Sequence, residues 1–150
     1  MARRRHPQLE LDEQLCFALY DAQRAVTRLY QPLLADLGLT YPQYLVMLVL
    51  WSADDPVSVG ELGARLHLDS GTLTPLLKRL EHAGLVTRTR DAADERRVLI
   101  ALTDDGLALR DRAEDIPARL FAQSDLDPRE LVALRNQLTT LVDAMEPTGG

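Results

Sequence analysis

The sequence predicts a mainly α-helical fold that contains one small β-hairpin. Over most of the chain, apolar residues recur at steps of three or four, which is the period of amphipathic helices. In residues 85–90 and 97–102 the pattern changes to an alternation rich in β-branched residues, which is typical of two short strands. The chain has 150 residues, which matches a single domain.

The composition indicates an ordinary globular protein, with 46% hydrophobic and 27% charged residues. Because Cys16 is the one cysteine, no disulfide can form within the chain, and we expect a reducing, cytoplasmic location. The longest apolar run, Leu45–Trp51, is far shorter than the roughly 20 residues that span a bilayer, so no membrane association is expected. The histidines lack zinc-ligand spacing, and no metal or other cofactor is predicted. The role of the basic segment at residues 3–5 stays open.

The first element is predicted as one long amphipathic helix over residues 11–37, with Asp12 as its candidate N-cap. Pro32 should kink this helix or end it early, because proline lacks a backbone N–H, and Gly38 closes the segment. A second, largely buried helix is expected to follow Pro42. The apolar stripe of the first helix needs a partner surface.

Two short helices joined by a tight turn come next. Ser58 and Glu61 match a capping box, which opens a helix over residues 59–66. A further helix, capped by Asp69 or Ser70, should run to about residue 82. Gly84 stands where a left-handed helix terminator is expected.

The hairpin follows directly, and two more helices complete the chain. Thr103 is the predicted cap of a fifth helix that bends at Pro117 and ends near Gln123. The residues Asp-Pro-Arg-Glu at 127–130 combine a cap, a first-position proline and a glutamate, so they predict the start of a sixth helix.

A helix pair followed by a hairpin has the order of a winged helix-turn-helix, whose second helix enters a DNA major groove. The outward face of that helix carries hydroxyls and cations, which suit phosphates and base edges: Ser70, Thr72, Thr74, Lys78 and Arg79. The hairpin carries arginines that suit a minor groove: Arg88, Arg90, Arg96 and Arg97. An ordinary polar helix face and a solvated hairpin fit the same pattern.

The charge distribution favours DNA binding more than the total charge does. The net charge is −6 and the pI about 5.0, whereas nucleic-acid-binding domains are usually basic. Residues 70–100 contain six Lys/Arg and four Asp/Glu, a balance of +2, while residues 104–150 contain five and ten, a balance of −5. The acidity therefore lies outside the proposed DNA face. Asp94 is placed to orient Arg96, two residues later.

The stretches LTYPQYLVMLVLW (39–51) and DSGTLTPLLKRLE (69–81), with Asp94-Glu95-Arg96, closely resemble the organic hydroperoxide regulators (OhrR-type) of the MarR family. The resemblance extends from LCFALY (15–20) to about Pro117 and includes LTDDG (102–106). It implies a homodimeric repressor of a pseudo-palindromic, double-stranded DNA operator. Dimerisation helices would lie in residues 1–38 and 104–147, and a winged DNA-binding lobe in residues 39–103. It also adds Pro75 and Asp94 to the expected DNA-binding residues.

The resemblance further implies that Cys16 senses organic hydroperoxides, its thiolate being oxidised to a sulfenic acid. Tyr30 and Tyr41 are the implied supporting residues, and Tyr20 lies one helical turn from the cysteine. Cys16 and Tyr30 would be about 21 Å apart along one helix, so they can meet only across a dimer. The candidate peroxide pocket consists of Phe17, Met47 and Trp51.

The chain has no second cysteine, so the resemblance points to the one-cysteine class of the family. In that class the resemblance implies that oxidation ends in a mixed disulfide with a low-molecular-weight thiol or in over-oxidation. Three alternatives stay open. Cys16 is a buried, inert hydrophobic residue; the protein is a MarR-type repressor that responds to an aromatic or phenolic ligand; or it is a peroxidase that turns over by itself. The sequence offers no acid–base constellation for the last, so we do not expect an enzyme.

Overall fold

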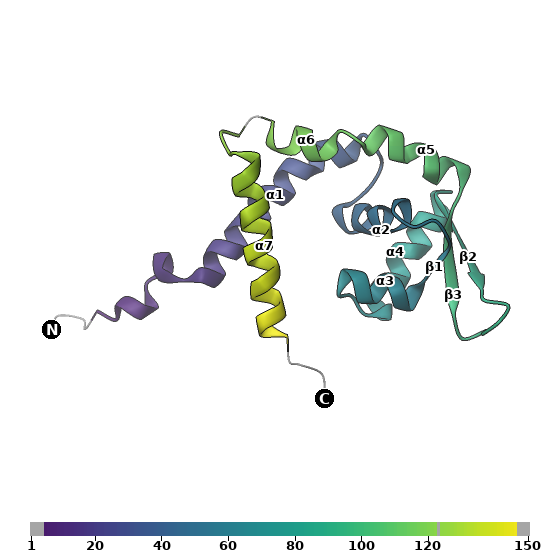
Figure 1. Ribbon diagram of the computed structural model, residues 1–150, viewed down its shortest axis with the longest axis horizontal. Helices are drawn as coiled ribbons and strands as arrows, with labels where there is room; N and C mark the ends of the chain where they lie inside the picture. Colours follow the sequence, from purple (N-terminus) through teal and green to yellow (C-terminus); the bar gives the residue numbers. More distant parts are fainter. Residues whose placement is uncertain (1–4, 123, 147–150) are drawn as a thin grey trace. The chain divides into compact units, whose positions relative to one another are not determined.

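The computed structural model describes residues 5–122 and 124–146 (Figure 1), and Arg3 and Arg4 lie outside this range. The fold is mainly helical with one small sheet, which confirms the predicted class. The chain divides into two compact units, the first ending at Ile116 and the second beginning at Pro117. The helices are α1 Leu15–Ala35, α2 Tyr41–Trp51, α3 Val59–Leu66, α4 Ser70–His82, α5 Asp104–Ala113, α6 Ile116–Phe121 and α7 Pro128–Met145, and the strands are β1 Val57–Ser58, β2 Val86–Arg90 and β3 Val98–Leu102.

The predicted start of the first helix is wrong. Two 3-10 turns, Pro7–Leu9 and Leu11–Glu13, come first, and Asp12 lies in the second turn and caps nothing there. Gln14 has an extended backbone, and its side-chain amide donates to the carbonyl oxygens of Gln8 and Glu10, both at 2.9 Å. These bonds hold the N-terminal turns in place of a continuous helix, so α1 begins at Leu15.

The end of α1 agrees with the prediction. Pro32 lies inside the helix, which ends one turn later at Ala35. Gly38 has a positive φ of 69°, and the next N–H, of Leu39, donates to the Leu34 carbonyl at 3.1 Å. Glycine suits this left-handed position because it has no Cβ.

The helix-turn-helix is formed by α3 and α4 as predicted. The capping box between Ser58 and Glu61 is present at the start of α3, and Asp69 caps α4. His67, between the two helices, adopts a left-handed conformation with φ 55°. A second capping box, between Thr40 and Gln43, starts α2 and was not predicted, although it matches the same pattern of hydroxyl and amide three residues apart.

The sheet has three strands in the order β1-β3-β2, all antiparallel. The hairpin of β2 and β3 confirms the prediction, and it projects as a wing from the helices of the lobe in Figure 1. The third strand, β1, was not expected because two residues carry no visible alternation. Val57 pairs with Ile100, so β1 joins the wing directly to the start of α3.

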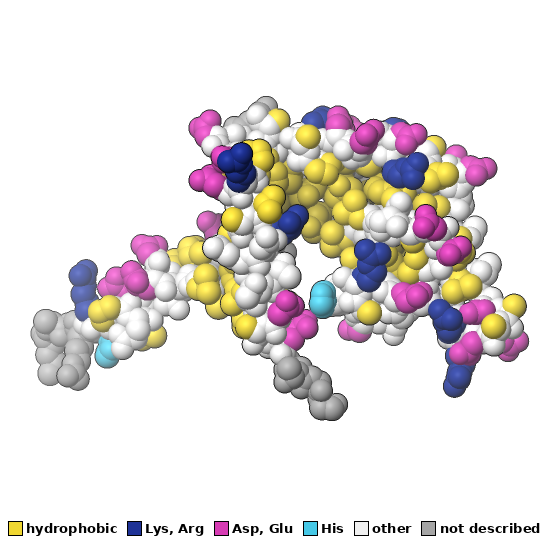
Figure 2. All heavy atoms as spheres, in the orientation of Figure 1, with side chains coloured by type: hydrophobic (Ala, Val, Ile, Leu, Met, Phe, Trp, Pro, Cys, Tyr) yellow, Lys and Arg dark blue, Asp and Glu magenta, His cyan; other side chains and the backbone are white. Residues whose placement is uncertain are grey.

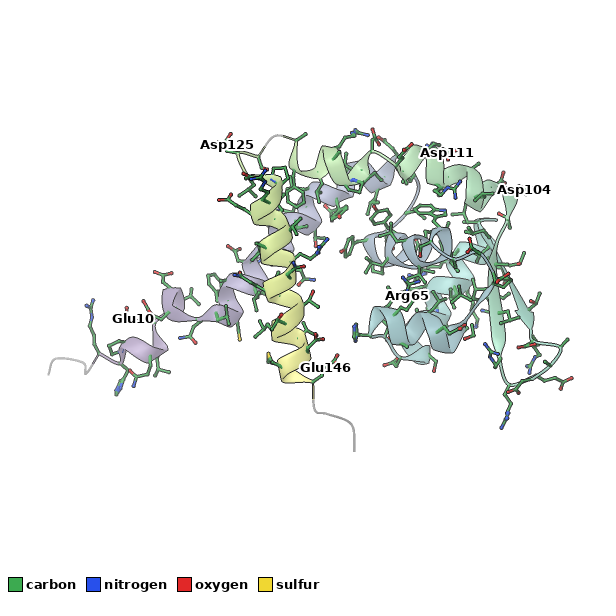
Figure 3. All side chains as sticks on the ribbon, viewed as in Figure 1. Glu10, Arg65, Asp104, Asp111, Asp125 and Glu146 are labelled. Carbon is green, nitrogen blue, oxygen red and sulfur yellow. The ribbon has the colours of Figure 1, made fainter. Side chains whose placement is uncertain are left out.

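We call residues 39–103 the lobe, and α5 packs closely against the start of its wing. Thr103 caps α5, accepting from the Gly106 N–H at 3.0 Å while its hydroxyl donates to the Gly84 carbonyl at 2.6 Å. Trp51 on α2 donates its indole N–H to the Gly106 carbonyl at 2.9 Å. Two helices and a loop therefore meet around a buried glycine. Figure 3 labels Asp104 at the start of α5.

The expected fifth helix is interrupted. It ends at Ala113, and α6 starts at Ile116, before Pro117; its predicted end near Gln123 lies outside the described residues. In the second unit, α7 starts as predicted, with Asp127 accepting from the Arg129 N–H at 2.8 Å. None of the helices that the structure describes is both long and apolar enough to cross a bilayer.

Candidate nucleic-acid interface and cysteine site

One side of α4 is buried and the other faces solvent. Four leucines anchor the helix in the lobe: Leu73, Leu76, Leu77 and Leu80. The predicted DNA-contacting residues of this helix lie on the remaining surface, where Ser70, Thr72, Pro75, Lys78 and Arg79 are exposed and Thr74 is half-buried. This polar surface is therefore free to enter the major groove of DNA.

The first turn of α4 is fixed by hydrogen bonds. The Thr72 N–H donates to Asp69 Oδ1 at 2.7 Å, and this bond holds the pKa of Asp69 below its ordinary value. The Thr74 hydroxyl donates to the Ser70 carbonyl at 2.7 Å, so its oxygen lone pairs remain as acceptors. The hydroxyl-bearing end of the helix is therefore ordered before any ligand binds.

The wing tip carries charged side chains of both signs (Figure 2). Arg96 is 91% exposed, and its Nε lies 3.2 Å from Asp94 Oδ1, which also accepts the Arg96 backbone N–H at 3.1 Å. The structure thus confirms that Asp94 orients Arg96. Arg90 donates from Nη1 to the Glu95 carbonyl at 3.1 Å, which closes the loop at its tip.

A groove of about 420 Å³ lies between α4, the start of α3 and the wing. Ser70, Thr74, Arg88 and Arg96 line it together, so residues predicted separately on the helix and the wing share one surface. Arg97 also lines the groove, and its guanidinium forms ion pairs with two carboxylates, a role that sequence analysis did not identify.

Cys16 lies exposed in the first turn of α1. The interpretation of Cys16 as a buried residue is therefore wrong within the single chain. Phe17 is 38% exposed on the same turn, whereas Met47 is fully buried in the lobe and Trp51 is half-buried beside Tyr44. The three residues predicted for the peroxide pocket do not line one cavity within the described chain.

The predicted tyrosines divide into two groups. Tyr30 and Tyr41 are in contact, with ring centroids 4.9 Å apart, and Tyr44 joins them at 5.8 Å from Tyr30. Tyr20 is exposed nearer the N-terminus, where Arg24 lies over its ring at 5.4 Å. Tyr44 was missed, although it follows Tyr41 by three residues and so shares its helix face.

Burial, reinforced by Tyr41 and Tyr44, raises the pKa of Tyr30 to about 12. Its hydroxyl therefore stays protonated at neutral pH and is a hydrogen-bond donor. Cys16 and Tyr30 both belong to α1, so they are about 21 Å apart within one chain. Among the described residues, no group of three His, Cys, Asp or Glu side chains is placed to hold a metal ion.

This chain is similar in sequence to known transcriptional regulators. The family model described as "Transcriptional regulator SarA/Rot" matches residues 28–113, more than half of the chain. The chain is 47% identical over 137 residues to the organic hydroperoxide resistance transcriptional regulator of Bacillus subtilis, covering 91% of this chain and 92% of that protein.

Solved structures agree. AbfR is a protein of Staphylococcus epidermidis. Its reduced form bound to DNA superposes with a TM-score of 0.76 at 34% identity, covering 93% of this chain and 97% of AbfR. Overoxidized AbfR bound to DNA gives 0.71 at 38%, covering 90% and 96%. PcaV from Streptomyces coelicolor, in complex with its natural ligand, gives 0.81 at 28%, covering 92% and 98%. The chain belongs to the MarR family of winged-helix transcriptional regulators, among the organic hydroperoxide resistance regulators.

Proposed function

We propose that this protein is a peroxide-sensing repressor that binds a pseudo-palindromic operator as a homodimer and releases it when an organic hydroperoxide oxidises Cys16. The observation that carries the proposal is the exposed thiol in the first turn of α1, separate from the groove and the wing. A sensor of this kind can react without occupying the DNA-binding surface.

DNA binding is supported by the groove and by the arginine that projects from the wing tip. Arg96→Ala and Lys78→Ala should each weaken operator binding and lower the salt slope by roughly one for each phosphate that the variant no longer neutralises. Arg110→Ala is the matched control, since it removes one exposed cation from α5, which belongs to neither the helix-turn-helix nor the wing. Unchanged affinity for both test variants would refute this docking.

The homodimer is supported by two helices with exposed apolar side chains. On α1 these include Leu15, Phe17 and Leu29, and α7 has Leu134 and Leu138. Helices that leave most of their apolar side chains exposed in the single chain need a second surface for them. A second copy of the chain supplies that surface and can also bring the partner's Tyr30 toward Cys16.

The proposed chemistry needs no cofactor. The Cys16 thiolate attacks one peroxide oxygen, the S–O bond forms as the O–O bond breaks, and the alkoxide leaves and takes a proton to become an alcohol. The resulting sulfenic acid condenses with a low-molecular-weight thiol, giving a mixed disulfide and water. Tyr30 and Tyr41 of the partner subunit would donate hydrogen bonds at this site.

We propose the mixed disulfide, rather than the over-oxidised cysteine, as the form that releases DNA. AbfR was crystallised on DNA in an overoxidized state, so over-oxidation did not prevent DNA binding in that relative. A mixed disulfide adds a bulkier group at the helix surface and has a greater capacity to separate packed helices.

The test measures operator binding by fluorescence polarisation before and after cumene hydroperoxide with a small thiol, for the wild type and Cys16→Ser. The wild type should release the duplex and then recover it when a dithiol reductant cleaves the disulfide. Cys16→Ser should bind throughout. Release of Cys16→Ser by the peroxide would end the proposal.

A repressor that responds to an aromatic or phenolic ligand is the second candidate. A groove of about 350 Å³ beside the tyrosine cluster supports it, lined by Thr27, Tyr30, Tyr41 and Pro42 among others. PcaV, of similar fold, was solved with its natural ligand. Release of both wild type and Cys16→Ser by a panel of phenolic acids, with no response to peroxide, would favour this function.

A further inference from the structure

The wing is attached to the helix-turn-helix by a short stretch of sheet. β1 has only two residues, which pair with β3 as Val57 with Ile100 and Ser58 with Leu99. The hairpin of β2 and β3 has five residue pairs, of which the last, Arg90 with Val98, lies beyond this attachment together with the wing loop. The direction of the wing therefore depends on additional contacts near its base.

The side chain of Glu61 on α3 is oriented by the capping box with Ser58, independently of its contact with the wing. The Ser58 N–H donates to Glu61 Oε2 at 2.7 Å, and the Glu61 N–H donates to Ser58 Oγ at 3.1 Å. The bond from the Ser58 backbone is the main reason that the pKa of Glu61 is below its ordinary value. Because the capping box already restricts this side chain, an ion pair with it costs less conformational entropy.

Arg97, just before β3, spans the distance from the wing loop to this carboxylate. Its Nη2 lies 3.8 Å from Glu61 Oε2, and its Nη1 lies 3.4 Å from Asp91 Oδ2. Asp91 is itself fixed, since its Oδ1 accepts the Ala93 N–H and its own N–H donates to the Arg97 carbonyl, both at 2.9 Å. The planar guanidinium thus bridges two preoriented carboxylates, one on α3 and one at the base of the wing loop.

The neighbouring arginine is arranged differently. The Arg96 side chain is 91% exposed and pairs with the loop's own Asp94, whereas the Arg97 side chain is 49% exposed and turned back toward α3. Consecutive residues of one charge therefore occupy distinct surroundings. One is free to reach a ligand, and the other holds the loop that carries it.

We infer that Arg97 is a positioning residue for DNA binding, which together with Glu61 and Asp91 fixes the wing relative to α3. The inference rests on the proposed DNA binding and assigns Arg97 a role other than contact with phosphate. The two roles make opposite predictions for Glu61. If Arg97 only attracts DNA, removal of the nearby negative charge strengthens binding; if the ion pair positions the wing, the same removal weakens it.

The experiment measures affinity for a duplex that the wild-type protein has selected from a random pool, over a range of salt concentrations. Glu61→Gln is the central variant, because glutamine keeps the capping acceptor and removes only the charge. It should weaken binding about two- to fivefold with an unchanged salt slope. Glu95→Gln is the matched control: it removes one exposed acid at the wing tip and should leave binding unchanged or tighter.

Two further variants separate the roles. Arg97→Lys keeps the charge but cannot bridge both carboxylates, so it should bind as weakly as Arg97→Gln. The double variant Glu61→Gln/Arg97→Gln should bind no more weakly than Arg97→Gln alone, because the two residues act through one contact. Thermal unfolding of each variant checks that the lobe remains folded.

Tighter or unchanged binding by Glu61→Gln, or a salt slope lowered by about one in Arg97→Gln together with near wild-type binding by Arg97→Lys, would overturn the inference. If Arg96→Ala and Lys78→Ala also leave affinity unchanged, the proposed DNA docking fails as well. If those two weaken binding as expected, only the positioning role is rejected.

Discussion

The winged lobe buries its apolar side chains within the chain, whereas α1 and α7 leave most of theirs exposed. Leu62, Leu73 and Ile100 in the lobe have no exposed surface, while Leu15 and Leu29 on α1 are 61% and 51% exposed. Leu34, near its end, is the one buried residue of α1, and no residue of α7 is buried. Both regions are rich in leucine, but only the lobe supplies the surface that its leucines need.

This difference in burial distinguishes a lobe that is packed within the chain from helices whose apolar faces are exposed. The lobe has the features of a self-sufficient reading module, since its helices are capped and its sheet is tied to α3 by β1. The exposed face of α1 carries Cys16 together with exposed apolar side chains such as Leu15 and Phe17. Figure 2 shows hydrophobic side chains along the visible part of α1. Substitutions on the exposed face of α1 and on the surface of α4 and the wing therefore test separate regions of the chain.

The largest expected effect concerns the close packing of the lobe. In Gly106→Ala, the new Cβ would collide with the Leu85 carbonyl oxygen, and the buried backbone there has little freedom to move. We expect the free energy of unfolding to fall by about 3 kcal/mol, measured by urea denaturation. Gly60→Ala on α3 is the control, because its Cβ would meet only the Ser58 hydroxyl, at 3.9 Å, and should cause no destabilisation. Equal stability of the two variants would contradict close packing at Gly106.

The exposed helix faces give the next effect. Leu138→Glu on α7 should raise the dimer dissociation constant at least about tenfold, measured by sedimentation equilibrium, because a charge would be buried between two copies. Thr140→Glu, two residues later and on the opposite side of the same helix, should leave the dimer intact. An unchanged dimer in Leu138→Glu would show that α7 does not form the partner surface.

The smallest expected effect is on the pH dependence of stability, through Tyr30, where α1 meets the lobe. The pKa of Tyr30 rises from 10.0 to about 12 because burial disfavours the tyrosinate, so the folded state holds this proton more tightly than the unfolded chain. Its contribution to stability is complete below pH 10 and is lost as the pH rises to about 12. Urea unfolding of Tyr30→Phe should therefore show a shallower decline over this range than the wild type. An equal decline would mean that Tyr30 titrates normally in the folded protein.

Local signals predicted most of the fold. The capping boxes at Ser58 and Asp127 and the left-handed Gly84 depend on residues within a few positions, so the pattern was sufficient. The start of α1 was wrong because the apolar spacing continues through the 3-10 turns that the Gln14 side chain holds. β1 was missed because its pairing partner lies on β3, far along the chain.

The site was predictable to a similar extent. The surface residues of α4 and the Asp94–Arg96 pair follow from helical spacing and from proximity in sequence. Arg97 was grouped with the wing-tip cations because its partner, Glu61, lies on another element. The peroxide pocket was predicted from apolar type alone, and that cannot distinguish the buried Met47 from the exposed Phe17.

In the proposed mechanism, modification of Cys16 by a thiol controls DNA binding from outside the lobe. The most direct measurement titrates the operator-bound protein with cumene hydroperoxide in the presence of a small thiol, and determines the intact mass and the bound fraction on the same samples. We expect the fraction of DNA released to rise in step with the fraction of Cys16 in mixed disulfide. Complete conversion of Cys16 with the operator still bound would contradict it.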